Sequence, residues 1–240
     1  MATDFVLGYP TATPDILAAR HTELAAFRLT KILDYGAVNL GQQAVLGLGY
    51  VGIVVLVERD RQQFALKIRR TNIDKLSLVA EAEYLQQANT VNIAPQVVQW
   101  SENFILMEYI VGESLFIWVQ RMSAMGKIEA IKLVIKNLLK QSFRLDQLGL
   151  DRGDMSCVTN DVVVRNEEPV LLDFSRASGD RRPQNVTALV QGLFWGSALA
   201  KYLQPTLSHC TKDQLLPLLR AYKQQQTTEH FAALTQAIFR

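Results

Sequence analysis

The sequence predicts an α+β fold in which a small antiparallel sheet precedes a mainly helical region. Three observations predict it. Short β-rich runs follow one another from residue 42 to residue 111, one helical segment interrupts them, and helical periodicity takes over after residue 112. We therefore expect a five-stranded sheet with one crossing helix over 42–111 and a reduced, mainly helical part over 112–240. Residues 1–41 are expected to form an extra N-terminal helical extension.

Helix-start residues and hydrophobic periodicity predict the helices and strands of the first half. Thr13-Pro14-Asp15 combines a cap, a proline in the first turn and an early acid, and helical spacing then predicts a helix that ends near Tyr35-Gly36. Polar turns separate the β-rich runs, so the first three are expected to form an antiparallel meander. The strands are expected at 44–46, 53–57, 64–68, 95–100 and 104–110, and the crossing helix at 74–88.

The second half begins after a hinge at 111–113. A long helical pattern there ends at Gly149, as a helix C-terminus commonly does. The predicted helices cover 114–121, 128–148, 185–202, 213–223 and 229–239, and two very short strands cover 162–164 and 170–172. The most apolar stretch, Ala188–Ala200, is expected to be the central buried helix of this part.

Composition excludes several classes of protein. Of 240 residues, 49% are hydrophobic and 20% charged, which argues against disorder and coiled coils. The net charge of +2 is too small for a nucleic-acid footprint, so nucleic acid is not indicated as a partner. Ala188–Ala200 is shorter than the ~20 residues that span a bilayer, so no membrane partner is expected.

Cysteine and histidine usage bears on the compartment. Cys157 and Cys210 form neither a disulfide framework nor a metal-ligand spacing, and the three histidines, His21, His209 and His230, lie far apart. The first residues lack a basic segment followed by an apolar core, so no signal peptide is expected. We expect a reduced, cytoplasmic protein without structural zinc.

Residues 47–52 form a GxGxxG pattern, whose three glycines are Gly47, Gly49 and Gly52. A dinucleotide-binding loop would lead into a helix, whereas here a β-rich run follows, so this loop is expected to join two strands. Such a hairpin can offer backbone N–H groups to a phosphate chain. A tight turn without a ligand remains the alternative at this point.

Lys67 lies inside an apolar strand, between Leu66 and Ile68. A buried ammonium needs an anion, which a phosphate would supply, although the two-residue period of a strand also allows Lys67 to face solvent. The crossing helix offers Glu81 and Glu83 as acids that could pair with it. We choose Glu81.

Two further segments carry polar groups of interest. Asp151–Asn160 follows the long helix and includes Asp154, and Asp173 stands directly after an apolar strand and before Phe174. A carboxylate in that position suits a hard cation such as Mg²⁺. A turn aspartate is the plainer explanation for an isolated Asp, but here it ends an ordered series of features.

Taken together, residues 47–173 resemble the protein-kinase-like superfamily, in a compact atypical branch. The nearest likenesses are RIO-type kinases, the small kinase of the tRNA threonylcarbamoyladenosine complex and a group of predicted microbial Ser/Thr kinases. The resemblance implies a bilobal fold, ATP with Mg²⁺ as cofactors, and transfer of the γ-phosphoryl group to a hydroxyl. The lobes would be 42–111 and 112–240.

The resemblance also implies a role for each matching residue. Lys67 and Asp154 would be catalytic, Asn160 and Asp173 would bind the metal, Met107 would be the gatekeeper, and the Glu108 carbonyl and Ile110 N–H would contact adenine. Glu81 would pair with Lys67, because Leu85 follows it at the spacing of the family pattern. The implied ATP-binding set is Gly47, Gly49, Gly52, Val54, Ala65, Lys67, Glu81, Met107, Glu108 and Ile110.

Departures from the family pattern leave alternatives open. Arg152 replaces the motif histidine and Gly153 the arginine after it. Asn160 stands six rather than five residues after Asp154, which we interpret as one inserted residue because its spacing to Asp173 fits; otherwise Asn160 is not the metal ligand. The usual peptide-docking platform is missing.

The predicted function is that of an atypical Ser/Thr protein kinase with ATP and a protein substrate as partners. The alternatives are a small-molecule kinase of the aminoglycoside or choline kinase type, and a nucleotide-binding pseudokinase or accessory ATPase subunit. Arg181 and Arg182 either meet an acidic substrate or form a solvated basic turn. The N-terminal helix either braces the sheet or docks a partner protein.

Overall fold

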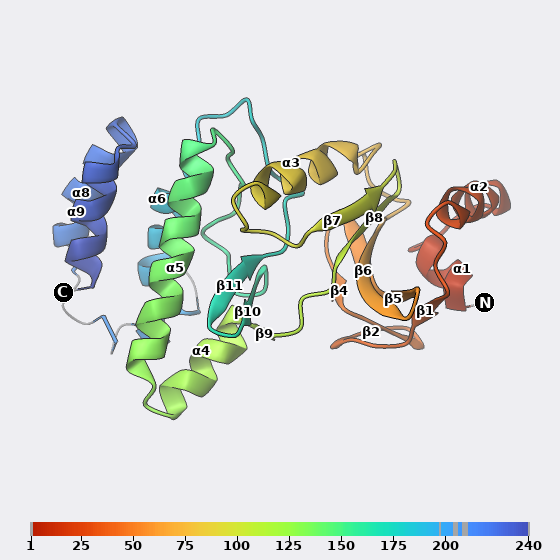
Figure 1. Ribbon diagram of the computed structural model, residues 1–240, viewed down its shortest axis with the longest axis horizontal. Coiled ribbons are helices and arrows are strands. Elements are labelled where there is room, and N and C mark those ends of the chain that lie inside the picture. The colour runs from red at the N-terminus through yellow and green to blue at the C-terminus, as the bar shows by residue number, and fades with distance from the viewer. Residues whose placement is uncertain (1, 197, 204–205, 208–210, 240) are drawn as a thin grey trace. The chain divides into compact units, whose positions relative to one another are not determined.

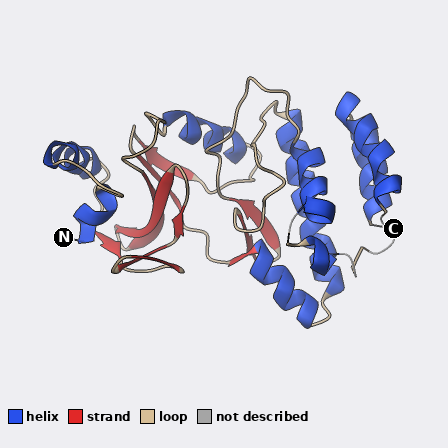
Figure 2. Ribbon diagram, turned by 180° about the vertical axis from the view of Figure 1, so that it is seen from behind, coloured by secondary structure: helices blue, strands red, loops and turns tan. Residues whose placement is uncertain are grey.

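The computed structural model describes residues 2–196, 198–203, 206–207 and 211–239, and the chain divides into two compact units. The first consists of Met1–Thr90 with Pro95–Ile110, and the second of Val91–Ala94 with Val111–Arg240. Figure 1 labels the elements, and Figure 2 shows that most of the strands belong to the first unit. The structure is α+β, as the sequence predicts.

The first unit contains a six-stranded antiparallel sheet, a separate two-stranded hairpin and three helices. The sheet order is β1-β5-β6-β8-β7, and β4 also pairs with β5. The bounds are α1 Ala2–Leu7, α2 Pro14–Ala25, β1 Lys31–Leu33, β2 Val38–Leu40, β3 Gln43–Val45, β4 Gly47–Leu48, β5 Gly52–Arg59, β6 Gln62–Arg69, α3 Val79–Asn89, β7 Val97–Trp100 and β8 Phe104–Glu108.

The N-terminal helix is shorter than the sequence predicts, and this is a correction. Thr13 caps α2, but the helix ends at Ala25 and Arg28 takes a left-handed conformation (φ 52°). Residues 31–33, which we expected to be helical, form β1 and pair with the outer edge of β5. Sheet pairing therefore overrides the helical periodicity here and adds to the sheet a strand that the sequence does not predict.

The predicted meander is also divided differently. Residues 43–45 pair with β2 in the separate hairpin, and the two residues of β4 continue beside β5. The crossing helix begins at Val79 rather than at 74. The strands predicted at 53–57, 64–68, 95–100 and 104–110 are present as β5, β6, β7 and β8.

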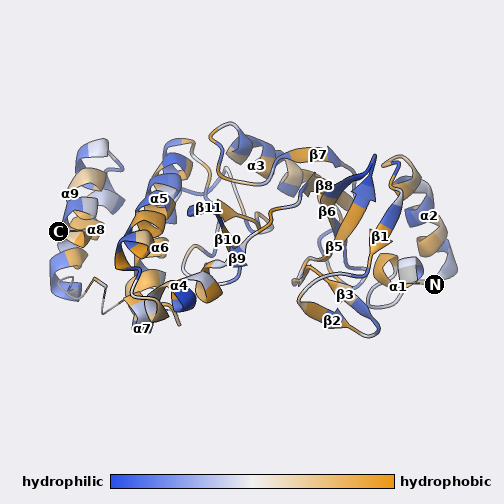
Figure 3. Ribbon diagram, turned by 60° about the horizontal axis from the view of Figure 1, so that its bottom comes forward, coloured by the Kyte–Doolittle hydropathy of each residue, from blue (hydrophilic) through white to orange (hydrophobic). Residues whose placement is uncertain are grey.

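One face of the large sheet carries the core of this unit. β5 is apolar along most of its length (Figure 3), and alternate residues of β5, β6 and β8 on this face pack against α1, α2 and the hairpin. The buried cluster is Val6, Leu7, Phe27, Leu40, Val45, Ile53, Val55, Val57, Leu66, Ile68, Phe104 and Leu106. The N-terminal segment is therefore part of the core of the first unit.

Polar contacts also tie α2 to the sheet. Arg20 is buried, donates to the Leu7 carbonyl and lies 3.3 Å from Asn103 Oδ1 in the β7–β8 turn. Glu23 accepts from both the backbone and side-chain N–H groups of Asn103, at 2.9 and 2.6 Å. Burial, and secondarily the charge of Arg69, lower the pKa of Arg20 to about 10. α2 thus braces the sheet.

The described residues of the second unit are mainly helical and include one three-stranded sheet in the order β11-β10-β9. The helices predicted at 114–121, 128–148, 213–223 and 229–239 are present, with ends that shift by up to three residues. The bounds are β9 Glu113–Ser114, α4 Leu115–Ala124, α5 Ile128–Gln147, β10 Val162–Arg165, β11 Glu168–Leu171, α6 Asn185–Gln191, η1 Gly192–Gly196, α7 Ala200–Leu203, α8 Lys212–Gln224 and α9 Thr228–Ile238.

The predicted helix over 185–202 is not continuous, which is a second correction. α6 gives way to the π-helical turn η1, and α7 begins only at Ala200. Glycines at both ends of η1 weaken the helical preference there. Ser197, within the predicted central helix, lies outside the described residues, as do His209 and Cys210. Among the residues described, no helix has the length and apolar character that crossing a bilayer requires.

Removing the Phe27 ring should unfold the first unit more easily. Phe27 is 1% exposed and packs edge-on against Phe104, with ring centroids 5.7 Å apart. We expect Phe27→Ala to lower the free energy of unfolding by about 3–5 kcal/mol, and Phe5→Ala, a half-exposed control on α1, by less than about 1 kcal/mol. Urea denaturation measures both. Equal effects would show that the N-terminal segment is a detachable extension.

Candidate functional site

In the first unit, four residues of the predicted ATP-binding set share the sheet face opposite the core cluster. Val54 pairs with Lys67 across β5 and β6, and Ala65 pairs with Met107 across β6 and β8. Because side chains alternate along a strand, these positions all project to one side. Ala65, Lys67 and Met107 are buried.

The Lys67 ammonium meets the carboxylate chosen from the sequence. Its Nζ lies 2.5 Å from Glu81 Oε1, and the Glu81 side chain is 1% exposed. Lys75 Nζ approaches the other oxygen at 3.8 Å. Glu83, the rejected alternative, is exposed on the far side of α3, and Leu85 is buried as the pattern requires. Lys67 therefore does not simply face solvent.

The glycine pattern forms a strand–turn–strand hairpin, as predicted. β4 pairs with β5, and the Gly49 N–H donates to the Gly52 carbonyl. A Cβ at Gly52 would lie 2.6 Å from the Ile68 carbonyl oxygen, so packing of the hairpin itself demands glycine there. At Gly47 a Cβ would meet nothing within 4 Å. Packing therefore does not require glycine at position 47. The absence of a side chain there leaves room for a ligand to approach the backbone.

The segment expected to contact adenine follows β8. The Glu108 N–H is held by the Gln96 carbonyl at 2.9 Å. The Ile110 N–H donates no hydrogen bond within the described part of the chain, and the Ile110 side chain is buried. A backbone donor of this kind is available for a ligand.

In the second unit, the side chain of Asn185 fixes the start of the predicted catalytic loop. Asn185 is fully buried at the first turn of α6. Its Nδ2 donates to the Leu150 carbonyl at 2.8 Å, and its Oδ1 accepts from the Arg152 N–H at 2.9 Å. One amide thus satisfies two backbone groups of the loop and sets its path.

Asp146, near the end of α5, anchors Asn185 in turn. One carboxylate oxygen accepts from the Asn185 N–H and Nδ2, and the other accepts from the Val186 N–H and from the Tyr222 hydroxyl at 2.7 Å. Burial raises the pKa of Asp146 even though these hydrogen bonds oppose the shift. The network joins α5, α6 and α8 to the loop.

A second close approach to the loop lies at Gly192, which directly follows α6. A Cβ at Gly192 would lie 2.3 Å from the Ser156 carbonyl oxygen, so only glycine allows the backbones to approach this closely. Asn185 and Gly192 are seven residues apart, which puts them on one face of a helix. Gly192 also begins the π turn, a deformation that is frequent at functional sites.

Asp154 projects from a strained turn. Gly153 and Asp154 both have left-handed backbones, with φ of 73° and 43°. The Asp154 carboxylate is 46% exposed, and its Oδ2 lies 2.5 Å from Nη1 of Arg176. An exposed carboxylate on a non-glycine residue in this conformation marks a functional candidate.

Asn160 and Asp173 flank the same end of the β10–β11 pair, since Asn160 comes two residues before β10 and Asp173 two residues after β11. β10 and β11 pair Val162 with Leu171, and the Leu172 N–H donates to the Asp161 carbonyl one step further along. Asn160 itself lies in the turn that leads into β10, beyond the last paired residue, so strand pairing does not set its position relative to Asp173. The Ser175 N–H donates to Asp173 Oδ1 at 2.9 Å and orients the carboxylate.

Asp161 is a charged neighbour that sequence reasoning missed. Its Oδ2 lies 3.3 Å from Nη2 of Arg152, whose side chain is 1% exposed and lies over the Phe174 ring. Burial raises the pKa of Asp161, the Arg152 charge opposes that shift, and the charge of Asp173 adds to it. Arg152, in the place of the motif histidine, thus neutralises an acid beside the candidate metal ligand.

The donor chemistry fits Mg²⁺ with few protein ligands. Carboxylate and amide oxygens of Asp173 and Asn160 are hard donors, and Mg²⁺ commonly takes one or two carboxylates with phosphates and water. Within the described ranges, no three His, Cys, Asp or Glu side chains gather to hold a metal by themselves. The residues therefore fit a metal bound together with nucleotide phosphates.

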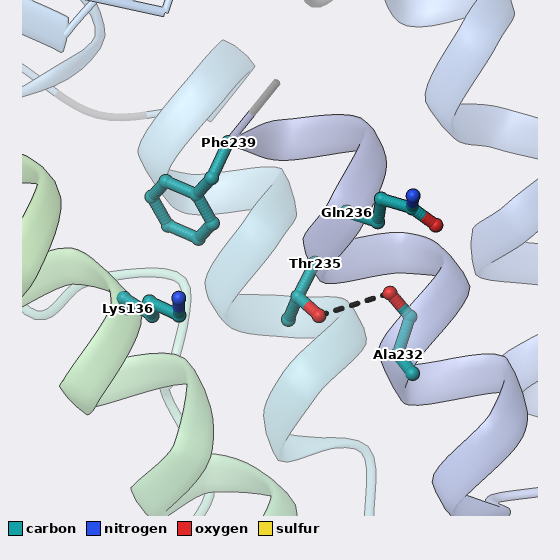
Figure 4. A pocket seen from close by; sticks show the side chains of 5 residues that line it. All are labelled: Lys136, Ala232, Thr235, Gln236 and Phe239. Carbon is teal, nitrogen blue, oxygen red and sulfur yellow. Dashed lines mark hydrogen bonds between the residues drawn. The ribbon is translucent and has the colours of Figure 1, made fainter.

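A pocket of about 470 Å³ lies elsewhere in the second unit, between α5 and α9 (Figure 4). The Thr235 hydroxyl, which lines it, donates to the Ala232 carbonyl at 3.0 Å. The lining residues are Lys136, Ala232, Thr235, Gln236 and Phe239. None of them belongs to the predicted site.

Comparison with known proteins decides the family. The model of the RIO domain matches residues 55–191, more than half of the chain. The chain belongs to the RIO domain family. The crystal structure of the Rio2 kinase-ADP/Mg²⁺-phosphoaspartate complex from Chaetomium thermophilum matches with a TM-score of 0.50 and 16% identity, over 93% of this chain and 74% of that one. No curated protein matches.

Membership of the RIO domain family confirms the resemblance to atypical protein-kinase-like proteins. At 16% identity, the match to Rio2 kinase concerns the fold, and it confirms the predicted kinase-like fold class. The matched region includes Lys67, Glu81, Asp154, Asn160 and Asp173. The glycine hairpin precedes it.

Sequence reasoning missed five residues of this RIO domain that contact or support the predicted catalytic loop. They are Asp146, Asp161, Arg176, Asn185 and Gly192. One signal was available for Asp161: a buried arginine in place of the motif histidine requires an acid. The others carry no spacing signal, because their partners are backbone groups or side chains that only the fold brings close.

Truncating Asn185 should disorganise the loop. Asn185→Ala leaves the Leu150 carbonyl, the Arg152 N–H and part of Asp146 without partners, so we expect a loss of about 2–4 kcal/mol in the free energy of unfolding. Thr187→Ala, on the same helix turn and partly exposed, is the control and should cost about 1 kcal/mol or less. Chemical denaturation measures both variants. Similar values for the two would contradict the anchoring role.

Proposed function

We propose that this RIO domain protein is an ATP- and Mg²⁺-dependent kinase that phosphorylates Ser or Thr hydroxyls of proteins. The observation that carries the proposal is the buried Lys67–Glu81 pair. A buried ion pair contributes little net stability, because desolvation offsets the attraction. Its place on the sheet face beside the glycine hairpin is what phosphate binding requires.

The first unit would be the N-lobe. Lys67, held by Glu81, would bind the α- and β-phosphates, and the backbone of Gly47–Gly52 would cover the phosphate chain. Val54, Ala65 and Met107 would line the adenine site. The Ile110 N–H and the Glu108 carbonyl would form hydrogen bonds with the adenine base.

The second unit would be the C-lobe. Asp173 and Asn160 would hold Mg²⁺, which neutralises charge on the β- and γ-phosphates when bound. Asp154 would orient the acceptor hydroxyl and take its proton while the hydroxyl oxygen bonds to the γ-phosphorus. The bond from that phosphorus to the β,γ-bridging oxygen breaks, and ADP leaves with both electrons of the bond.

Nucleotide binding is the first test. ATP with Mg²⁺ at 100 times its Kd should raise the free energy of unfolding by about 2.7 kcal/mol. A thermal unfolding series with ATP, with and without Mg²⁺, measures it. The Asp173→Asn variant should lose the part of the shift that depends on Mg²⁺. No shift in the wild type would contradict all of the kinase proposals.

Phosphoryl transfer is the second test. With γ-labelled ATP, the wild type should label itself or a protein acceptor, and Asp173→Asn or Lys67→Met should lower the rate about 100-fold or more. Glu81→Gln should lower it about 10-fold or more because Lys67 loses its partner, whereas Glu83→Gln on the same helix is the matched control and should not.

The chemistry of the labelled product separates the alternatives. The Rio2 structure contains a phosphoaspartate, so the label should be treated with hydroxylamine, which cleaves acyl phosphates and spares Ser and Thr esters. A hydroxylamine-stable label supports the proposal. Nucleotide binding without any labelled protein would favour a small-molecule kinase if label appears on an added alcohol, and an accessory nucleotide-binding subunit if it does not.

A further inference from the structure

The segment 174–183 links the candidate metal ligand Asp173 to α6 and contains three arginines. Two of them have structural partners. Arg181 Nε lies 3.0 Å from Asp151 Oδ2, and Arg182 donates to the last carbonyls of α8 at 2.6 and 2.9 Å. Those carbonyls form the negative end of a helix, which favours a cation. The third, Arg176, has a different partner.

Arg176 pairs with the predicted catalytic carboxylate. Its Nη1 lies 2.5 Å from Asp154 Oδ2, while its side chain remains 64% exposed. A guanidinium carries five N–H donors, and this pair is the contact found for it within the described residues. Most of its donors are therefore open to a second anion that approaches Asp154 from solvent.

Neighbouring segments hold the backbone of Arg176 in place. A Cβ at Gly153 would lie 2.8 Å from the Arg176 carbonyl oxygen and 2.9 Å from its Cβ, so glycine at 153 is what lets the two segments touch. Arg181 donates to the same carbonyl at 2.6 Å. Asp151 and Ser178 exchange two backbone hydrogen bonds, at 3.0 and 2.8 Å. The main chain of Arg176 is thus held beside the turn that carries Asp154.

We propose that Arg176 is the residue of this chain that selects the acceptor, and that it selects Ser or Thr next to an acidic side chain. This inference rests on the proposed function. A carboxylate of the acceptor peptide would bind the open N–H donors of Arg176 in a bidentate pair. The same contact places the neighbouring hydroxyl at Asp154.

The geometry explains why the acidic group must be close to the hydroxyl. Arg176 contacts Asp154 directly, so an anion bound to Arg176 lies within a few ångströms of the group that receives the hydroxyl proton. Neutral acceptors would leave the guanidinium paired with Asp154 alone. Acceptor peptides with basic side chains would be repelled by the positive charges of Arg176 and of its neighbour Arg181.

The test compares two peptides that differ only in charge. One carries Ser flanked by Glu, and the other carries Ser flanked by Gln, with γ-labelled ATP and Mg²⁺ as co-substrates. For the wild type we expect kcat/KM to be about fivefold higher for the acidic peptide, the size expected of one partly exposed charge pair. Arg176→Ala should reduce this preference to about twofold or less.

Three further arms make the test specific. Arg176→Lys keeps the charge but loses the planar guanidinium that donates two parallel hydrogen bonds, so it should retain only part of the preference. Arg176→Glu should prefer a Lys-flanked peptide. Arg220→Ala removes the same charge from an exposed position on α8 and should keep the wild-type preference. Circular dichroism checks that each variant folds, which is expected because Arg176 is exposed.

Equal wild-type rates on both peptides, or a preference that survives in Arg176→Ala, would overturn the proposal. A wild type that phosphorylates neither peptide but still binds ATP with Mg²⁺ would also overturn it, while leaving the nucleotide site of the proposed function in place. Absence of nucleotide binding would instead overturn the proposed function itself. The two failures are thus distinguished in the same preparation.

Discussion

The geometry of the second unit depends on one buried amide, the side chain of Asn185. It binds a carbonyl on one side of the loop turn and an N–H on the other, and Asp146 holds it from behind. Because none of these groups reaches water, each must find its partner inside the protein, which allows the loop few alternative paths. Gly192 adds a second point of close approach on the same helix. The exposed carboxylate of Asp154 is consequently presented by a rigid base, as precise positioning of a reacting group requires.

Buried charge gives each unit its chemical character. Lys67 and Glu81 form one buried pair in the first unit, and Arg152 with Asp161 forms another, more exposed on the acid side, in the second. Neither pair is an efficient way to stabilise a fold, since apolar side chains of similar volume would serve as well or better. Lys67 is placed where a phosphate would share it. Arg152 holds Asp161 next to Asp173 and packs on Phe174, so it controls the charge and shape around the candidate metal ligands.

Much of the fold could be predicted from the sequence because strand and helix periods are strong in β5, β6, β8 and α5. The helix predicted to reach Tyr35 failed, because pairing of residues 31–33 with β5 outweighs a helical pattern that has no partner beyond Ala25. The choice of Glu81 over Glu83 follows from the spacing to Leu85 in the family pattern, and it agrees with the pairing in the structure because residues four apart share one face of a helix. Asn185 and Arg176 could not be found this way, since each acts through backbone or side chains distant in sequence.

The proposed function requires Lys67 and Asp173 to bind the same nucleotide, and a crystal structure of the protein with a non-hydrolysable ATP analogue and Mg²⁺ would test this requirement. We expect a metal ion about 2.1 Å from a carboxylate oxygen of Asp173, with phosphate oxygens within hydrogen-bonding distance of Lys67 Nζ. The same density would show whether Asn160 or Asp161 completes the coordination. A nucleotide bound away from Lys67, or a metal that does not touch Asp173, would overturn the proposed function.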